Sequence, residues 1–180
     1  ILSALTLTLN KYTFSDNTLI TTIFNGRSNP FYYETQGFLV KTLPLIFNNK
    51  NRQETIKEFI NGIDKVWKDT ISHSAYPYTN IAEDYQLKPE FFFAYQEFMD
   101  SDEILINGKP YEDYELAADD LLATAYKINF DLSAFEDTLE FEINYNDELY
   151  SEDYIKTFIN SMKFVLEQFA SSNIEKQRIC

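Results

Sequence analysis

Residues 36–47 read QGFLVKTLPLIF. It is an apolar run with Gly37 at its head and Pro44 near its end. Such a run is typical of a buried β-strand. Proline cannot donate a hydrogen bond to a sheet, so we expect the strand to stop or bend at Pro44.

The length and composition indicate one compact domain, residues 1–180. Of these 180 residues 44% are hydrophobic and 17% aromatic, which is enough for a sizeable core. The chain holds 15 basic and 29 acidic residues, a net charge of −14. This charge repels phosphate backbones and anionic lipids, which argues against nucleic-acid and membrane partners.

The cysteine content and the two ends of the chain give further expectations. Cys180 is the only cysteine, so no disulfide can form within the chain and no thiolate metal cluster can be built. This usage and the absence of a visible secretion leader fit a cytoplasmic protein. The chain opens on Ile1 in mid-pattern and without a methionine, so we expect it to be part of something longer.

Hydrophobic periodicity predicts both helices and strands. Apolar residues from Ile56 to Trp67 recur at helical spacing, which makes Trp67 a core residue rather than a ligand site. Residues 51–54 have the form of a capping box before this helix, and Ser151 is expected to cap a final helix. Residues 1–12 fit either a strand or a helix by period. Strands are expected at 18–24, 91–96, 125–135 and 139–145, and a hairpin turn at Asn107-Gly108.

Several segments match the signatures of one known family in the same order. Residues 36–46 fit the pattern I-G-x-F-V-N-T-L-P-L-R, residues 73–79 fit H-Q-D-Y-P-F-E, and residues 88–96 fit a shortened N-P-L-F-Q-V-M-F-S-Y-Q-N. Residues 127–133 fit K-F-D-L-S-L, and Gly26-Arg27 stands where the family has G-R. As a set these segments resemble the condensation domains of nonribosomal peptide synthetases, which have a helix at the position of residues 1–12.

The resemblance implies a fold and a place within it. The chain is expected to be the C-terminal lobe of a condensation domain, an α/β (α+β) two-layer sandwich of the chloramphenicol acetyltransferase-like fold. In that fold a mixed sheet has helices packed on one face. Two such lobes form a V with the active site between them, and the N-terminal lobe carries the catalytic motif H-H-x-x-x-D-G. This motif is absent from the chain, so we expect the fragment to be inactive alone and assign no catalytic residue.

The resemblance also implies substrates and site residues. Intact condensation domains join an acyl or peptidyl thioester to an aminoacyl amine, both carried on phosphopantetheine arms of carrier domains, and no tightly bound cofactor is expected. Partners would be those carrier domains, neighbouring synthetase domains and the missing lobe. We expect Gly37, Thr42, Ala94, Tyr95 and Gln96 to lie nearest the substrate tunnel. Structural roles are expected for the family-motif residues Gly26, Arg27, Pro44, His73, Tyr76, Pro77 and Asp131.

Two features limit the chemistry that the chain can perform. His73 is the only histidine, so a two-histidine metal site cannot form, and we interpret it as a structural histidine at a turn. Several polar positions of the family pattern are also replaced. Lys41 stands for an asparagine, Ile46 for an arginine, Ser74 and Ala75 for glutamine and aspartate, and Ala94 for a frequent serine.

Three functions therefore remain open. The chain is part of a working condensation domain, or of a degenerate one that serves as a carrier-binding scaffold, or of an acyltransferase of the same fold that uses free acyl-CoA. The amino-acid substrates cannot be read from this half. Condensation, cyclisation and epimerisation variants share the fold and are not separated by these residues.

Overall fold

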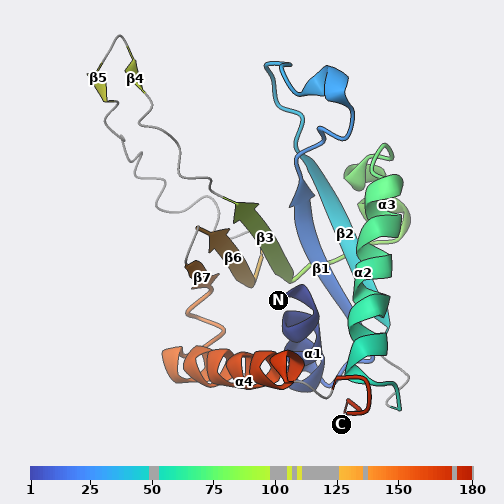
Figure 1. Ribbon diagram of the computed structural model, residues 1–180, viewed down its shortest axis with the longest axis vertical. Helices are drawn as coiled ribbons and strands as arrows, with labels where there is room; N and C mark the ends of the chain where they lie inside the picture. Colours follow the sequence, from blue (N-terminus) through green and yellow to red (C-terminus); the bar gives the residue numbers. More distant parts are fainter. Residues whose placement is uncertain are drawn as a thin grey trace.

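The computed structural model describes residues 1–48, 53–97, 105–106, 109–110, 126–135, 138–171 and 174–179. It has two layers, a five-stranded sheet and a set of helices packed on one face of it (Figure 1). The expected two-layer sandwich is therefore confirmed. Four predicted features fall partly or wholly outside the described residues. These are Asn51 of the capping box, the turn Asn107-Gly108, the link Glu136-Asp137 and the terminal Cys180.

The large sheet is mixed, as expected. Its strands lie in the order β2-β1-β3-β6-β7. The outer pairs β1/β2 and β6/β7 are antiparallel, and the inner pairs β1/β3 and β3/β6 are parallel. The strand bounds are β1 Asn17–Phe24, β2 Lys41–Asn48, β3 Phe91–Glu97, β6 Ile128–Ala134 and β7 Leu139–Tyr145. Two short strands, β4 Leu105–Ile106 and β5 Lys109–Pro110, form a separate antiparallel pair.

Three long helices cover one face of the sheet, and a fourth is short. They are α1 Leu2–Thr13, α2 Ile56–Ser72, α3 Tyr78–Asp84 and α4 Glu152–Ala170, together with a 3-10 turn, η1 Pro30–Tyr32. The helix implied for residues 1–12 is confirmed. The hydroxyls of its buried threonines Thr6 and Thr8 are satisfied, because they donate to the carbonyls of Leu2 and Ala4, each at 2.8 Å.

The start of β2 and the role of Pro44 differ from the prediction. The strand does not stop at Pro44 but runs from Lys41 to Asn48, and Pro44 lies opposite Thr21 of β1 in the middle of it. Proline is tolerated because β2 is at the edge of the sheet, where one side of the strand needs no ladder hydrogen bonds. Only alternate residues, Leu43, Leu45 and Phe47, are buried, as expected for an edge strand with one covered face.

The capping box of α2 lies four residues later than predicted. Thr55, not Asn51, is the N-cap, and its Oγ1 accepts from the backbone N–H of Glu58 at 3.2 Å. The carboxylate of Glu58 accepts in return from the Thr55 backbone N–H at 2.8 Å. The final helix is capped as predicted, because the Ser151 hydroxyl accepts from the Tyr154 N–H at 3.3 Å.

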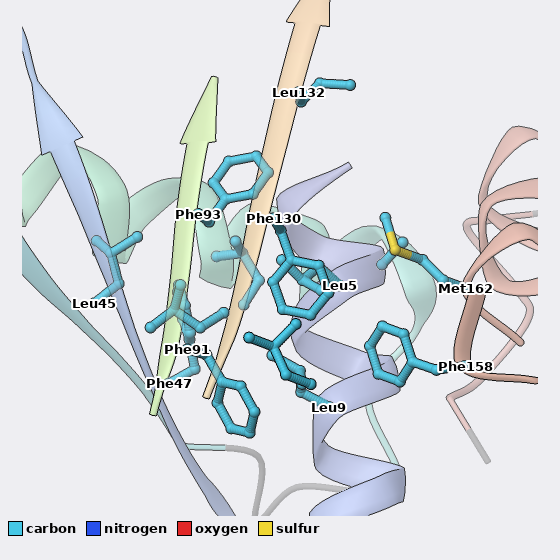
Figure 2. Close-up of a cluster of buried hydrophobic side chains, with 14 of the residues drawn as sticks. Leu5, Leu9, Leu45, Phe47, Phe91, Phe93, Phe130, Leu132, Phe158 and Met162 are labelled. Carbon is cyan, nitrogen blue, oxygen red and sulfur yellow. The ribbon is translucent and has the colours of Figure 1, made fainter. Parts of the chain in front are cut away.

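The core lies between the sheet and the helices (Figure 2). Leu5 and Leu9 of α1 lie between the aromatic side chains of β3 and β6 and the α4 residues Phe158 and Met162. Phe130 is fully buried at the centre, with its ring centroid 5.6 Å from that of Phe158. The α2 face contributes Phe59 and Ile63, with Trp67 partly buried against the same cluster. The predicted apolar face of α2 is thus confirmed.

Candidate functional site

The predicted tunnel residues of β3 do not share one face of the sheet. Side chains alternate along a strand, so Tyr95 follows the buried Phe91 and Phe93 on the helix face. Ala94 and Gln96 point to the opposite face. Ala94 is only 2% exposed, whereas the side chain of Tyr95 is 51% exposed. Tyr95 is therefore the aromatic group of this strand that remains accessible on the helix side.

The other two predicted tunnel residues belong to β2 and the segment before it. Thr42 lies on β2 opposite Ile23, so β1 separates it from β3. Gly37 precedes the strand with a φ of +147°, a conformation that favours glycine, and no atom lies within 4 Å of where its Cβ would be. The five residues do not form one cluster, and the tunnel assignment stays a prediction for each.

Gly26 and Arg27 organise the loop between β1 and β2. The Arg27 guanidinium donates from Nη1 to the carbonyl oxygens of Tyr32 and Thr35, the latter at 2.9 Å, and from Nη2 to that of Gly37 at 3.5 Å. Several carbonyls of one loop thus share one planar cation, a geometry that arginine provides and lysine does not. The predicted structural role of Arg27 is consistent with these contacts.

His73 closes the end of α2. Its Nδ1–H lies 2.8 Å from the carbonyl oxygen of Asp69, one helical turn earlier. Tyr76 donates its hydroxyl to Asp84 at 3.4 Å, and Pro77 is the N-cap residue of α3. The three family-motif residues therefore lie at the turn from α2 into α3, and their structural role stays a prediction.

A hollow on the helix side was not predicted from the sequence. It has a volume of about 400 Å³ and lies between α1, α2 and the carboxyl ends of β3 and β6. Tyr95, Trp67 and Leu132 are among its walls. Trp67 was expected to be core, and it does pack on the core, yet its other side faces this space. No sequence period could reveal the hollow, because its walls come from four elements brought together only by folding.

Two carboxylates meet on the face of the sheet opposite the helices. Asp131 of β6 lies directly opposite Glu142 of β7. Burial, and secondly the charge of Glu142, raises the pKa of Asp131 above its ordinary value. The Glu142 carboxylate accepts a hydrogen bond from the Asn144 side chain at 3.0 Å. The two carboxylates make this part of the sheet acidic. Asp131 also lies beside Ala94, its neighbour in the β3/β6 register.

Metal and membrane functions gain no support from the part of the chain that the structure describes. There, no three histidine, cysteine, aspartate or glutamate side chains converge as ligands of a metal ion would. None of the helices described combines the length and apolarity needed to cross a bilayer. The hollow marks the surface around the ends of β3 and β6 as the candidate site.

The fold places the chain in a class of proteins. Its mixed sheet with helices on one face is similar to one lobe of solved condensation domains, which have the chloramphenicol acetyltransferase-like fold. Residues 1–178 match the family model "Condensation domain". The chain belongs to the condensation-domain family.

Three relatives illustrate the extent of the similarity. Gramicidin S synthase 2 of Brevibacillus brevis is 23% identical over 176 residues, which cover 93% of this chain and 4% of that protein. The condensation domain of the monacolin K polyketide synthase MokA has a TM-score of 0.71 at 15% identity, over 99% of this chain and 42% of that one. The four-domain nonribosomal peptide synthetase AB3403 has a TM-score of 0.75 at 14% identity, over 94% of this chain and 14% of that one.

Proposed function

We propose that this chain is the C-terminal lobe of a condensation domain that forms amide bonds between two carrier-bound substrates. The amine nitrogen of an aminoacyl thioester attacks the carbonyl carbon of an acyl or peptidyl thioester. A C–N bond forms, the C–S bond breaks, and the released thiol takes up the proton that the amine loses. The observation that carries the proposal is the family match over residues 1–178, joined to the lobe fold.

The catalytic base would come from outside this chain. The sequence has one histidine, His73, which is held at a turn between two helices, and no H-H-x-x-x-D-G motif. The chain spans about two fifths of the solved condensation domain from MokA. The role of this lobe is to supply one wall of the substrate passage and part of the surface on which carrier domains dock.

Exposed apolar side chains support the proposal that this lobe packs against a second lobe. Phe31 and Phe38, in the loop that Arg27 organises, are 89% and 90% exposed. Large apolar groups exposed close together on one loop indicate an interaction surface. We assign this loop to contact with the preceding lobe of the same domain.

The test uses the full-length protein that contains this chain. Donor and acceptor carrier domains are loaded separately, mixed with the protein, and assayed for the amide product by mass spectrometry of the carrier-bound species. The expected result is product that depends on both loaded carriers. No product, under conditions where a control condensation domain is active, would overturn the proposal.

A scaffold that binds carriers without chemistry is the second candidate. It is favoured by the replacements Lys41, Ile46, Ser74 and Ala75, of which Ile46 is an apolar side chain 51% exposed where the family has arginine. Measuring carrier binding beside turnover separates the two. Binding without product, with a broken H-H-x-x-x-D-G motif upstream, would support the scaffold.

A further inference from the structure

The hollow below Tyr95 has the size of a binding site for a small group. Its volume of about 400 Å³ falls within the range of ligand pockets, about 300–1,000 Å³. The helix layer covers Phe93, which is 5% exposed, but leaves Tyr95 half-exposed two residues further along the same face. The hollow is therefore the place where the two layers separate at the carboxyl ends of β3 and β6.

Each of the four elements around the hollow contributes apolar side chains to its walls. Leu2 comes from α1, Ile60 and Trp67 from α2, Phe93 from β3 and Leu132 from β6. Water in such a space makes few hydrogen bonds, so an apolar group that displaces it gains affinity.

The polar groups at the hollow do not select a charged ligand. The carboxylate of Asp64 lies 2.6 Å from the ammonium group of Lys68, one turn along α2, so its charge is already balanced. The other polar side chains, Ser3 and Tyr95, are neutral hydroxyls. A cation finds no free carboxylate here, and the net charge of −14 on the protein disfavours an anion. The chemistry fits a neutral apolar group.

We propose that this hollow receives the apolar side chain of a carrier-bound substrate, of the size of leucine or phenylalanine, and so contributes to substrate selection. The proposal rests on the proposed function. Trp67 and Ile60 line the hollow, and the half-exposed Tyr95 stands at its rim, where its hydroxyl can donate to a substrate carbonyl. Small polar side chains leave the walls unfilled and are disfavoured.

Two substitutions at one position change the volume in opposite directions. In the full-length protein, Ile60→Trp fills the hollow and Ile60→Ala enlarges it. The control is Asn61→Trp, the next residue of α2, which is exposed and does not line the hollow. kcat/KM is measured for acceptors carrying alanine, leucine, phenylalanine or aspartate with one fixed donor, and then for the same four residues at the end of the donor with one fixed acceptor. The arm that responds identifies the substrate whose side chain binds.

We expect Ile60→Trp to lower kcat/KM for leucine and phenylalanine about tenfold or more relative to alanine, since a pocket discriminates by about 10- to 200-fold per methylene. Ile60→Ala should shift the preference toward phenylalanine, and Asn61→Trp should change neither. Equal losses of kcat/KM for all four side chains with both the donor and the acceptor series would overturn the proposal, and so would unchanged kcat/KM with either variant. Either result would mean that other protein residues, and not a substrate, fill the hollow. If Ile60→Trp fails to fold, the shift with Ile60→Ala decides alone.

A binding measurement separates this proposal from the proposed function. N-acetylphenylalanine methyl ester is titrated into the full-length protein and its Ile60→Trp variant by saturation-transfer NMR. Binding to the parent that the variant loses supports the hollow even if no amide product forms. Active condensation combined with no binding to either protein, and with no side-chain preference, would overturn the hollow and leave the proposed function intact.

Discussion

Gly26 lies so close to Leu39 that a Cβ built on it would stand 2.0 Å from the Leu39 carbonyl oxygen. The contact joins the end of β1 to the segment that leads into β2. Gly26 also has a φ of +71°, which residues with a side chain rarely adopt. Two independent constraints, backbone conformation and close approach, therefore require glycine at this position.

Gly26→Ala should destabilise the fold by at least about 2 kcal/mol, because the left-handed backbone costs alanine about 1–2 kcal/mol and the clash adds to it. Chemical denaturation measures the effect. The matched control is Gly62→Ala within α2, where a Cβ meets no atom within 4 Å. That change should stabilise by about 0.5–1 kcal/mol. If both variants changed the free energy of unfolding in the same direction, the requirement for glycine at position 26 would be contradicted.

Thr55→Ala tests the observed start of α2. The Thr55 hydroxyl accepts from the Glu58 N–H, so its removal leaves a helix N-terminal donor without its cap and should cost about 1 kcal/mol. Urea denaturation gives the change in the free energy of unfolding. Thr55→Ser keeps the hydroxyl and should restore most of the stability. A cap at residue 51 instead would make Thr55→Ala neutral.

The misplaced cap shows what a sequence pattern can and cannot fix. Residues 51–54 and Thr55 to Glu58 both have a polar residue three positions before a glutamate, but only the second has the threonine of the usual capping box. The sequence therefore held the signal for the later start, and packing agrees with it, because Ile56 is the first residue of the helix that the core buries. The apolar faces of α2 and α4 were predictable because their spacing is a property of the helix alone.

The sheet and the site depend on contacts distant in sequence. The parallel pairing of Ile20 with Phe91 joins residues 71 positions apart, and the edge position of Pro44 follows only from that order of strands. The separation of Tyr95 from Ala94 and Gln96 was readable in principle from the two-residue period of a strand. The hollow beside Trp67 was not, since four elements build it.

Asp131→Asn should stabilise the fold at neutral pH. Burial first, and the charge of Glu142 second, raise the pKa of Asp131 above its ordinary 3.8. A carboxyl whose folded pKa is raised stabilises the fold below pH 3.8, and that contribution is lost as the pH rises through the folded pKa. Like charges directly opposite on paired strands are destabilising. The variant should gain more stability at pH 7 than loss of the Glu142 charge alone would give, because burial is the larger cause, and nothing near pH 3.

Glu142→Gln provides the second arm of this experiment. It removes the neighbouring charge while keeping an oxygen that can accept from the Asn144 side chain. Thermal unfolding from pH 3 to pH 8 should show a smaller gain than with Asp131→Asn, because burial is the larger cause of the raised pKa. A stability difference for Asp131→Asn that does not vary with pH would exclude the charge as its source.

Tyr95→Ala tests the strand end that faces the hollow. Tyr95 is half-exposed on the helix side of β3, at the rim of the space proposed for a substrate side chain. Its removal in the full-length protein should slow amide formation by roughly tenfold, since it takes away both an apolar wall and a hydroxyl donor. Loading of the carrier domains should be unaffected, because that reaction does not involve this lobe. Single-turnover condensation and carrier loading, both followed by mass spectrometry, measure the two steps separately.

Two further substitutions assign the cause of the Tyr95→Ala effect. Tyr95→Phe keeps the ring and removes the hydroxyl, so a rate close to that of the parent would assign the effect to the wall. A rate close to that of Tyr95→Ala would assign it to the hydrogen bond. Tyr85→Ala removes a tyrosine that is 75% exposed just after α3 and should leave condensation unchanged. Unaltered kinetics in Tyr95→Ala would exclude the helix side of the β3 end from the substrate passage, and Thr42 and Gln96 on the opposite face would then be the residues to test.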